Sequence, residues 1–217
     1  MKDFKKFGTS KTEIWHISIA LFALAVAFSF ILFSKEIFHS GTYFYYSPQF
    51  FFETLIAVGF AFVLHELGHK FVAEKYGLWA EFRMWPLGLL LAVLMAVFSR
   101  GSFVFAAPGA TMIAPIKETK KGFVMKKVRI DAAGMGKIGL AGPIVNNILT
   151  LLFIGLFSFL PLHMFKIAAQ INGWLAIFNL LPFMILDGQK VWHWSKWAWG
   201  GAMLLSVALF LMSGILI

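Results

Sequence analysis

The sequence predicts an all-α polytopic membrane protein, a bundle of about five to six transmembrane helices with a re-entrant, membrane-dipping β element. Apolar residues make up 60% of the 217 positions and charged residues only 13%, and the mean hydropathy is +0.81. A soluble domain carries about 25% charged residues because its whole surface faces water. This chain cannot cover a globule with polar side chains, so we expect its surroundings to be lipid.

The length and the charge limit the organisation and the partners. We expect residues 1–217 to form a single membrane-embedded domain with no separate soluble domain. The net charge of +9 would also suit nucleic acid, but in so apolar a chain basic residues more often set the membrane topology. The expected partner is therefore the lipid bilayer and no nucleic acid, while the oligomeric state stays open. The chain has no cysteine, so a metal would be held by His, Asp or Glu.

Apolar stretches of about 20 residues, the length that a helix needs to cross the hydrocarbon core, predict the spans. They cover residues 14–33, 51–73, 138–160, 165–186 and 198–217. A basic segment, 1–12, precedes the first span, which we interpret as a retained anchor because no small-residue cleavage site follows it.

The segment 86–131 is predicted to hold the re-entrant helix and the β element. Pro86–Phe98 is apolar but only roughly 20 Å long as a helix. Phe103–Ile116 contains two prolines and a glycine and is predicted to return as extended chain, with Phe123–Ile130 as a second extended segment. Such backbone is tolerated at membrane depth only where protein or a water-filled cavity satisfies its polar groups. Two thin spans over 86–116 are the alternative.

Basic residues predict the orientation, because they concentrate in cytoplasmic loops. The lysines before the first span are Lys2, Lys5, Lys6 and Lys11. A second basic segment contains Arg100, Lys117, Lys120, Lys121, Lys126, Lys127, Arg129 and Lys137. Both segments fall on one side only if the chain dips into the membrane at 86–116 and returns. We therefore expect a multi-pass protein of the cell membrane with a cytoplasmic N-terminus.

The motif His65-Glu66-Leu67-Gly68-His69 lies within the second predicted span. On a helix, residues four apart share one face, so both imidazoles can reach one metal ion. Glu66 lies about 100° round the helix, beside the metal, where it can act as a general base. A chance occurrence is the alternative, but ionisable residues inside a span are functional by default. We expect one Zn²⁺ per chain, with Glu66 as the catalytic residue.

Catalytic zinc sites usually have a third protein ligand. Position along the helix, predicted exposure or the wrong membrane face disfavours Glu53, Glu74, Glu81, Glu118 and His163. Asp187 remains, at the end of the predicted span 165–186. That end lies on the same side of the membrane as the later half of span 51–73, which carries the motif. An ordinary Asp-Gly turn is the alternative for Asp187.

Three motifs together resemble the site-2 protease family of intramembrane metalloproteases. They are HELGH, Gly142-Pro143-Ile144-Val145-Asn146, and the run from Asn179 through Pro182 to Leu186-Asp187-Gly188. The resemblance extends over about residues 51–188 and corresponds to a compact form without a PDZ or CBS domain. HExxH alone is moderately specific, but its combination with a distant Asn…Pro…Leu-Asp-Gly run is highly specific.

The resemblance implies a ligand set and an activity. Zinc would be held by His65, His69 and Asp187, with Asn179 and Asn146 near the scissile carbonyl of the substrate. For Asn146, interhelical hydrogen bonding is the alternative. The implied activity is zinc-dependent endoproteolysis within the membrane, so the expected partners are transmembrane protein substrates. A membrane zinc protease with a Glu as third ligand, and a metal transporter or scaffold, are the rival functions.

Two further interpretations concern the polar segments. In relatives, a membrane-dipping β element in this region pairs with substrate; a basic hairpin on the lipid surface is the alternative. Tryptophan and lysine residues near the start of the last span are typical of membrane-interface anchors. They are Lys190, Trp192, Trp194, Lys196, Trp197 and Trp199.

Overall fold

The computed structural model describes residues 8–40, 48–100, 102–119, 122–125, 130–183 and 185–215. Most of segment 1–12 and the last residues of span 198–217 lie outside these ranges. The basic residues outside them are Lys2, Lys5, Lys6, Lys120, Lys121, Lys126, Lys127 and Arg129.

The described chain is mostly helical, and four of its helices are long and apolar enough to cross a membrane. They are the first part, Lys11–Phe30, of helix α1 (Lys11–Ser40), the helix Pro48–Lys75, α5 (Ala132–Phe159) and α8 (Lys196–Ile215). They overlap the predicted spans 14–33, 51–73, 138–160 and 198–217. These helices indicate a membrane protein, although the predicted count of five to six is not confirmed.

The predicted span 165–186 is shorter in the structure. Helix α6 covers His163–Asn179, 17 residues, and ends seven positions before Leu186. Pro182 accounts for the difference, because a proline disfavours helical backbone in the residue before it and cannot continue a helix. The chain then crosses a short loop and enters helix α7 (Asp187–Trp194). Asp187 is thus the first residue of a new helix rather than the last of the span.

The helix Pro48–Lys75 contains a change of helical type just before the HELGH motif. It consists of α2 (Pro48–Val58), the π-helical turn η1 (Gly59–Val63) and α3 (Leu64–Lys75). Short π-helical segments occur often at functional sites. Here the carbonyl of Ala61, inside η1, accepts a 2.9 Å hydrogen bond from the Asn146 amide on α5.

Segment 79–125 forms the β structure. β1 (Trp79–Met84) pairs with β2 (Gly109–Ala114) in an antiparallel ladder from Trp79↔Ala114 to Met84↔Gly109. Helix α4 (Pro86–Phe98) lies between the two strands in sequence and has the bounds predicted for the re-entrant helix. β3 (Ile116–Thr119) and β4 (Gly122–Met125) form a separate hairpin. The predicted extended segment 103–116 contains β2, whereas β1 was not predicted.

The prediction that Glu81, in β1, is exposed is wrong. The Glu81 side chain is buried and forms an ion pair with the guanidinium of Arg83. Residues two apart on a strand point to the same face, so the two charges neutralise each other locally.

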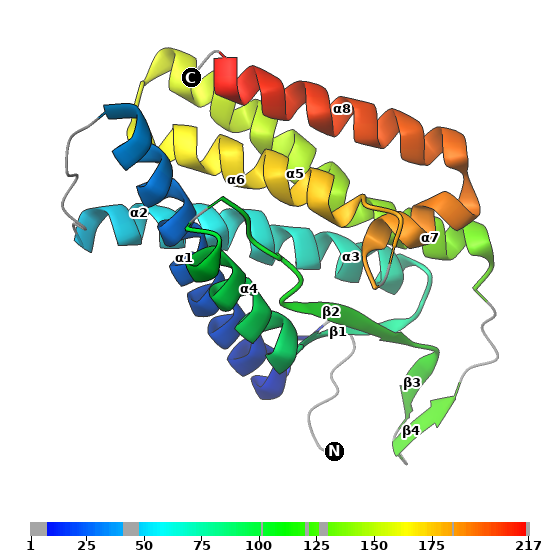
Figure 1. Cartoon of the computed structure of the whole chain (residues 1–217). Coiled ribbons are helices and arrows are strands. Elements are labelled where there is room, and N and C mark those ends of the chain that lie inside the picture. Colours follow the sequence, from blue (N-terminus) through cyan, green and yellow to red (C-terminus); the bar gives the residue numbers. More distant parts are fainter. Residues whose placement is uncertain are drawn as a thin grey trace.

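Helix α3 lies between two layers (Figure 1). On one side it packs against α5, which is followed by α6 and α8; on the other it contacts the sheet of β1 and β2. Helix α1 packs against α2, α4 and β1. The short helix α7 packs against α5 and joins α6 to α8. This arrangement brings the start of α7, the middle of α3 and strand β2 together.

The outside of the helices carries large apolar side chains. The most exposed of these include Phe98, Phe159, Leu204 and Ile215, which lie on α4, α5 and α8. A soluble monomer rarely presents a large contiguous apolar surface. The exposed side chains therefore agree with lipid surroundings.

Candidate metal centre

The structure brings His65, His69 and Asp187 together in a buried cluster. The Nε2 atoms of the histidines are 3.0 Å apart, and Asp187 Oδ2 lies 3.3 Å from His65 Nε2 and 2.8 Å from His69 Nε2. Ligand atoms about 2.0–2.2 Å from a tetrahedral zinc ion are separated by about 3.3 Å. The three atoms therefore lie close to the positions required of one face of a zinc coordination tetrahedron.

The hydrogen bonds of the two imidazoles leave both Nε2 atoms free for a metal. His65 Nδ1 donates to Asn146 Oδ1 at 2.5 Å, and His69 Nδ1 donates to the carbonyl of Ile138 at 2.7 Å. Both partners are acceptors, so each neutral imidazole carries its proton on Nδ1 and a lone pair on Nε2. Two lone pairs and the Asp187 carboxylate then converge without a proton between them. Such a donor set fits a cation, and such orienting partners are typical of metal-bound histidines.

Helix α5 makes room for the cluster at Gly142. A Cβ atom there would lie 2.5 Å from Nε2 of both His65 and His69. Only a glycine lets the α5 backbone approach the imidazoles so closely. The same helix supplies Asn146 and the Ile138 carbonyl, so α5 both spaces and orients the two ligands of α3.

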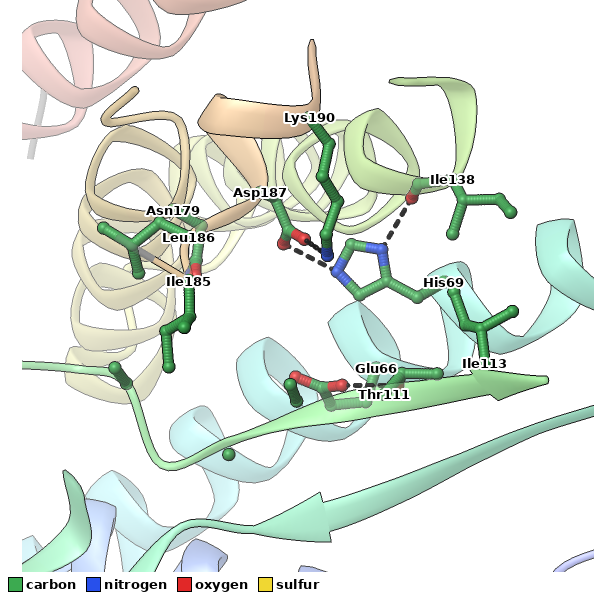
Figure 2. A pocket seen from close by; sticks show the side chains of 13 residues that line it. Glu66, His69, Thr111, Ile113, Ile138, Asn179, Ile185, Leu186, Asp187 and Lys190 are labelled. Carbon is green, nitrogen blue, oxygen red and sulfur yellow. Dashed lines mark hydrogen bonds and ion pairs between the residues drawn. The ribbon is translucent and has the colours of Figure 1, made fainter. Parts of the chain in front are cut away.

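Asp187 uses its two carboxylate oxygens differently (Figure 2). Oδ2 faces the imidazoles of His65 and His69, whereas Oδ1 accepts a 2.8 Å hydrogen bond from Lys190 Nζ, one turn further along α7. Burial works against the charged form of Lys190, but the adjacent carboxylate outweighs it and the pKa of Lys190 is raised. The charged ammonium therefore leaves Asp187 one oxygen, Oδ2, for a metal.

Glu66 lies beside this cluster and is held by the sheet. Its Oε2 accepts a 2.7 Å hydrogen bond from the hydroxyl of Thr111 on β2. Both residues line a small cavity with His69, Asp187 and Lys190, which has room for about one water molecule. A carboxylate beside a metal position and next to a water-sized space has the placement of a general base.

The predicted substrate residues occupy different surroundings. Asn179 lines the same cavity from the end of α6, and its amide donates to the carbonyl of Leu175. Asn146 is fully buried, and its amide donates to the Ala61 carbonyl and to Asn172 Oδ1. Both N–H groups of Asn146 are thus used between helices, which leaves no donor for a substrate carbonyl and agrees with the interhelical alternative.

Three of the residues set aside as third ligands have partners away from the metal centre. Glu53 contacts His163, with 3.1 Å between Oε2 and Nδ1, and Glu81 is paired with Arg83. Within the described ranges, His65, His69 and Asp187 are the group whose donor atoms come close enough to hold a metal.

Sequence reasoning missed two residues of the site. The sequence predicts Lys190 to be a membrane-interface anchor, although its spacing of three from Asp187 on a helix would place the two side chains together. No local signal marks Thr111, because its approach to Glu66 depends on the packing of the sheet against α3.

Comparison with known proteins supports the same chemistry. No protein-family model and no solved structure matches the chain. It is 35% identical over 223 residues to "Putative zinc metalloprotease MJ0611" of Methanocaldococcus jannaschii, covering 95% of this chain and 97% of that protein. It is 31% identical over 147 residues to "Putative zinc metalloprotease YwhC" of Bacillus subtilis, covering 60% of this chain and 63% of that protein. The full-length match to the archaeal protein shows that the chain belongs to this family of zinc metalloproteases.

Proposed function

We propose that the protein is a zinc-dependent intramembrane endopeptidase of the site-2 protease type, which cleaves transmembrane segments of membrane proteins. His65, His69 and Asp187 would hold one zinc ion, and Glu66 would be the general base. The observation that carries the proposal is the convergence of two Nε2 atoms and one carboxylate oxygen from two helices, with a further carboxylate at the edge of the same cavity.

The residues around the centre divide the chemistry between them. When bound, zinc supplies Lewis-acid activation of water and polarises the scissile carbonyl. Glu66 accepts a proton at its carboxylate and returns it to the leaving amine. Thr111 holds that carboxylate toward the cavity. Asn179, at the cavity wall, is the residue we assign to the substrate carbonyl oxygen, where a donor in the best-studied protease is worth about 3 kcal/mol.

The sheet supports an extended substrate. A peptide bond in a helix is shielded, because its carbonyl is bonded within the helix. Strand β2 lines the cavity through Gly109, Ala110, Thr111 and Ile113, and in the described chain it pairs only with β1. An unwound substrate segment can therefore add to the other edge of β2 and exchange its internal hydrogen bonds for intermolecular ones.

The apolar exterior supports a membrane location for the reaction. The HELGH motif follows the most apolar part of the helix Pro48–Lys75, and Asp187 follows the end of α6. With the N-terminus in the cytoplasm, as the basic residues predict, these two positions lie toward the cytoplasmic side of the membrane. We therefore assign the active site to that side.

Metal analysis together with a cleavage assay tests the proposal. The wild type, Glu66→Gln and Asp187→Ala are purified in detergent and incubated with a model transmembrane substrate. We expect about one zinc ion per wild-type chain, retained zinc without cleavage in Glu66→Gln, and loss of both in Asp187→Ala. Undiminished cleavage by Glu66→Gln would exclude Glu66 as the general base and contradict the proposed mechanism. Full zinc occupancy in Asp187→Ala instead favours a protease with a Glu ligand, and zinc flux in proteoliposomes without cleavage favours a transporter.

A further inference from the structure

Helix α1 contacts the outer edge of β1 through two side chains. Oε1 of Glu13 accepts a 3.0 Å hydrogen bond from the main-chain N–H of Phe82, and Nδ1 of His16 accepts one of 3.4 Å from the N–H of Met84. Glu13 and His16 lie three residues apart, on one face of the helix. Phe82 and Met84 are alternate residues of the strand, so their N–H groups point to one edge. The side chains of Glu13 and His16 thus bond the N–H groups that a further strand would need for pairing with β1.

The register of the ladder determines which main-chain groups of β2 point away from β1. Because the N–H groups of Phe82 and Met84 point outward, the pairs Phe82↔Thr111 and Met84↔Gly109 are the non-hydrogen-bonded pairs of the ladder. The main-chain polar groups of Thr111 and Gly109 therefore point away from β1, toward the unpaired edge of β2. Both residues line the cavity of the metal centre. The sheet thus has one edge covered by α1 and one open edge at the site.

The same carboxylate connects the sheet to the helix of the metal ligands. Oε2 of Glu13 lies 2.6 Å from Nζ of Lys70, and both side chains are buried. Lys70 follows His69 on α3 and also donates to the carbonyl of Gly8. A buried ion pair is retained only where its geometry satisfies both charges, and within a membrane protein it is functional by default. Here it joins α1, β1 and α3 at one point.

The local sequence predicts a hydrogen bond for Glu13 within its own helix, and the structure shows different partners. Ser10-Lys11-Thr12-Glu13 has the spacing of a capping box, in which the glutamate bonds back to the N–H of the first residue. The serine half of the box is present, since Ser10 Oγ accepts from the Glu13 N–H at 3.0 Å. The Glu13 carboxylate instead bonds Phe82 and Lys70, so both of its oxygens serve tertiary contacts.

We infer that Glu13 is a positioning residue for substrate: with His16 it covers the outer edge of β1, and with Lys70 it fixes the sheet relative to α3, so that an extended substrate adds only to the edge of β2. This inference rests on the proposed endopeptidase function. Glu13 contacts no reacting atom and acts through the sheet. Its loss therefore weakens the binding of the substrate strand and leaves the chemistry at the metal unchanged.

Two double variants isolate the contact with the strand. Glu13→Gln/Lys70→Met and Glu13→Leu/Lys70→Met both remove the two charges, so neither leaves an unpaired buried ion. The two side chains at position 13 have a similar size, but the Gln carbonyl can still accept the hydrogen bond from Phe82, whereas Leu has no acceptor. For both variants we measure the rate of amide exchange at Phe82 and the zinc content. We also measure KM and kcat on the model transmembrane substrate.

We expect exchange at Phe82 to be about tenfold faster in the Leu variant than in the Gln variant. We also expect KM to be about tenfold higher, with kcat and zinc content within about twofold. Equal exchange rates at Phe82 in the two variants would show that Glu13 does not cover the outer edge of β1. Faster exchange with equal KM, or a fall confined to kcat, overturns the positioning role. If the wild type cleaves no transmembrane substrate, the proposed function fails, and amide exchange still decides whether Glu13 covers β1.

Discussion

The hydroxyl of Thr111 donates a 2.7 Å hydrogen bond to the carboxylate of Glu66. Thr111 lies on the strand whose open edge faces the cavity, and Glu66 lies on the helix that carries both histidines. The strand proposed to hold the substrate and the proposed general base are therefore in direct contact. The Thr111 hydroxyl therefore orients the Glu66 carboxylate.

Removal of the Thr111 hydroxyl is expected to slow catalysis. Thr111→Val keeps the size and shape of the side chain but leaves the Glu66 oxygen without its donor, and we expect kcat to fall about tenfold. Thr111→Ser keeps the hydroxyl and should retain most of the activity. The measurement is kcat on the model substrate, with zinc content as control. A serine variant as slow as the valine variant would show that the methyl packing, and not the hydrogen bond, is what matters.

Asn146 should affect the binding of zinc rather than of substrate. Its Oδ1 accepts the proton of His65 Nδ1, and loss of such an orienting partner typically lowers metal affinity about 10–100-fold. We expect a loss of this size in Asn146→Ala, measured by competition with a chromophoric chelator. Asn147→Ala is the matched control, because the adjacent Asn147 is also buried but its amide atoms bond no described residue. Equal losses in the two variants would attribute the effect to packing of α5.

The parts of the site that follow from local spacing could be predicted from the sequence. The i, i+4 relation places His65 and His69 on one face whatever the tertiary structure, and the run ending at Asp187 marks a second polar position near a helix end. The structure brings all three together. The extended segment 103–116 was also predictable, because its prolines and glycine oppose a helix.

Features set by contacts distant in sequence could not be predicted in this way. Strand β1 carries Glu81 and Arg83, which indicated an exposed segment. Its pairing with β2, distant in sequence, makes it a strand, and the ion pair between the two side chains then permits the burial of Glu81. The π-helical turn at Gly59–Val63 has no local sequence signal, and the carbonyl of Ala61 within it accepts a hydrogen bond from Asn146 of α5. The early end of α6 was the exception, since Pro182 lies within the predicted span and opposes a continuous helix.

Gly142 is expected to be indispensable for the metal centre. An Ala at this position would bring Cβ to 2.5 Å from both Nε2 atoms, which the helix backbone cannot avoid without moving away from α3. We expect Gly142→Ala to lower zinc affinity about 100-fold or more, beyond the effect of losing one orienting partner. Calorimetric titration of the metal-free protein with zinc measures it.

Gly155→Ala provides the control on the same helix. No atom lies within 4 Å of a Cβ placed there, so this change should leave zinc affinity unaltered and stabilise the helix by about 0.5–1 kcal/mol. A Gly142→Ala protein that binds zinc as tightly as the Gly155→Ala protein would contradict the close approach of α5 to the imidazoles.

The loop that presents Asp187 is held by Trp199. The indole Nε1 of Trp199, on α8, donates a 2.7 Å hydrogen bond to the carbonyl of Leu180, at the end of α6. Its ring also packs edge-on against Trp192 of α7, with 4.8 Å between centroids. Trp199 therefore ties together the three helices that surround the loop, in addition to the interface role predicted for it.

Trp199→Phe keeps an aromatic ring but leaves the carbonyl of the fully buried Leu180 without this donor. We expect the free energy of unfolding to fall by about 1–3 kcal/mol and zinc to be lost faster to a chelator, because the loop before Asp187 is less constrained. Trp197→Phe is the matched control: Trp197 is 93% exposed, and its replacement should change stability by less than about 0.5 kcal/mol. Thermal unfolding in detergent, with and without added zinc, distinguishes the two. If both variants lose the same stability, the hydrogen bond to Leu180 does not hold the loop; if only Trp199→Phe does, and added zinc restores part of the loss, the loop and the metal centre are coupled through Asp187.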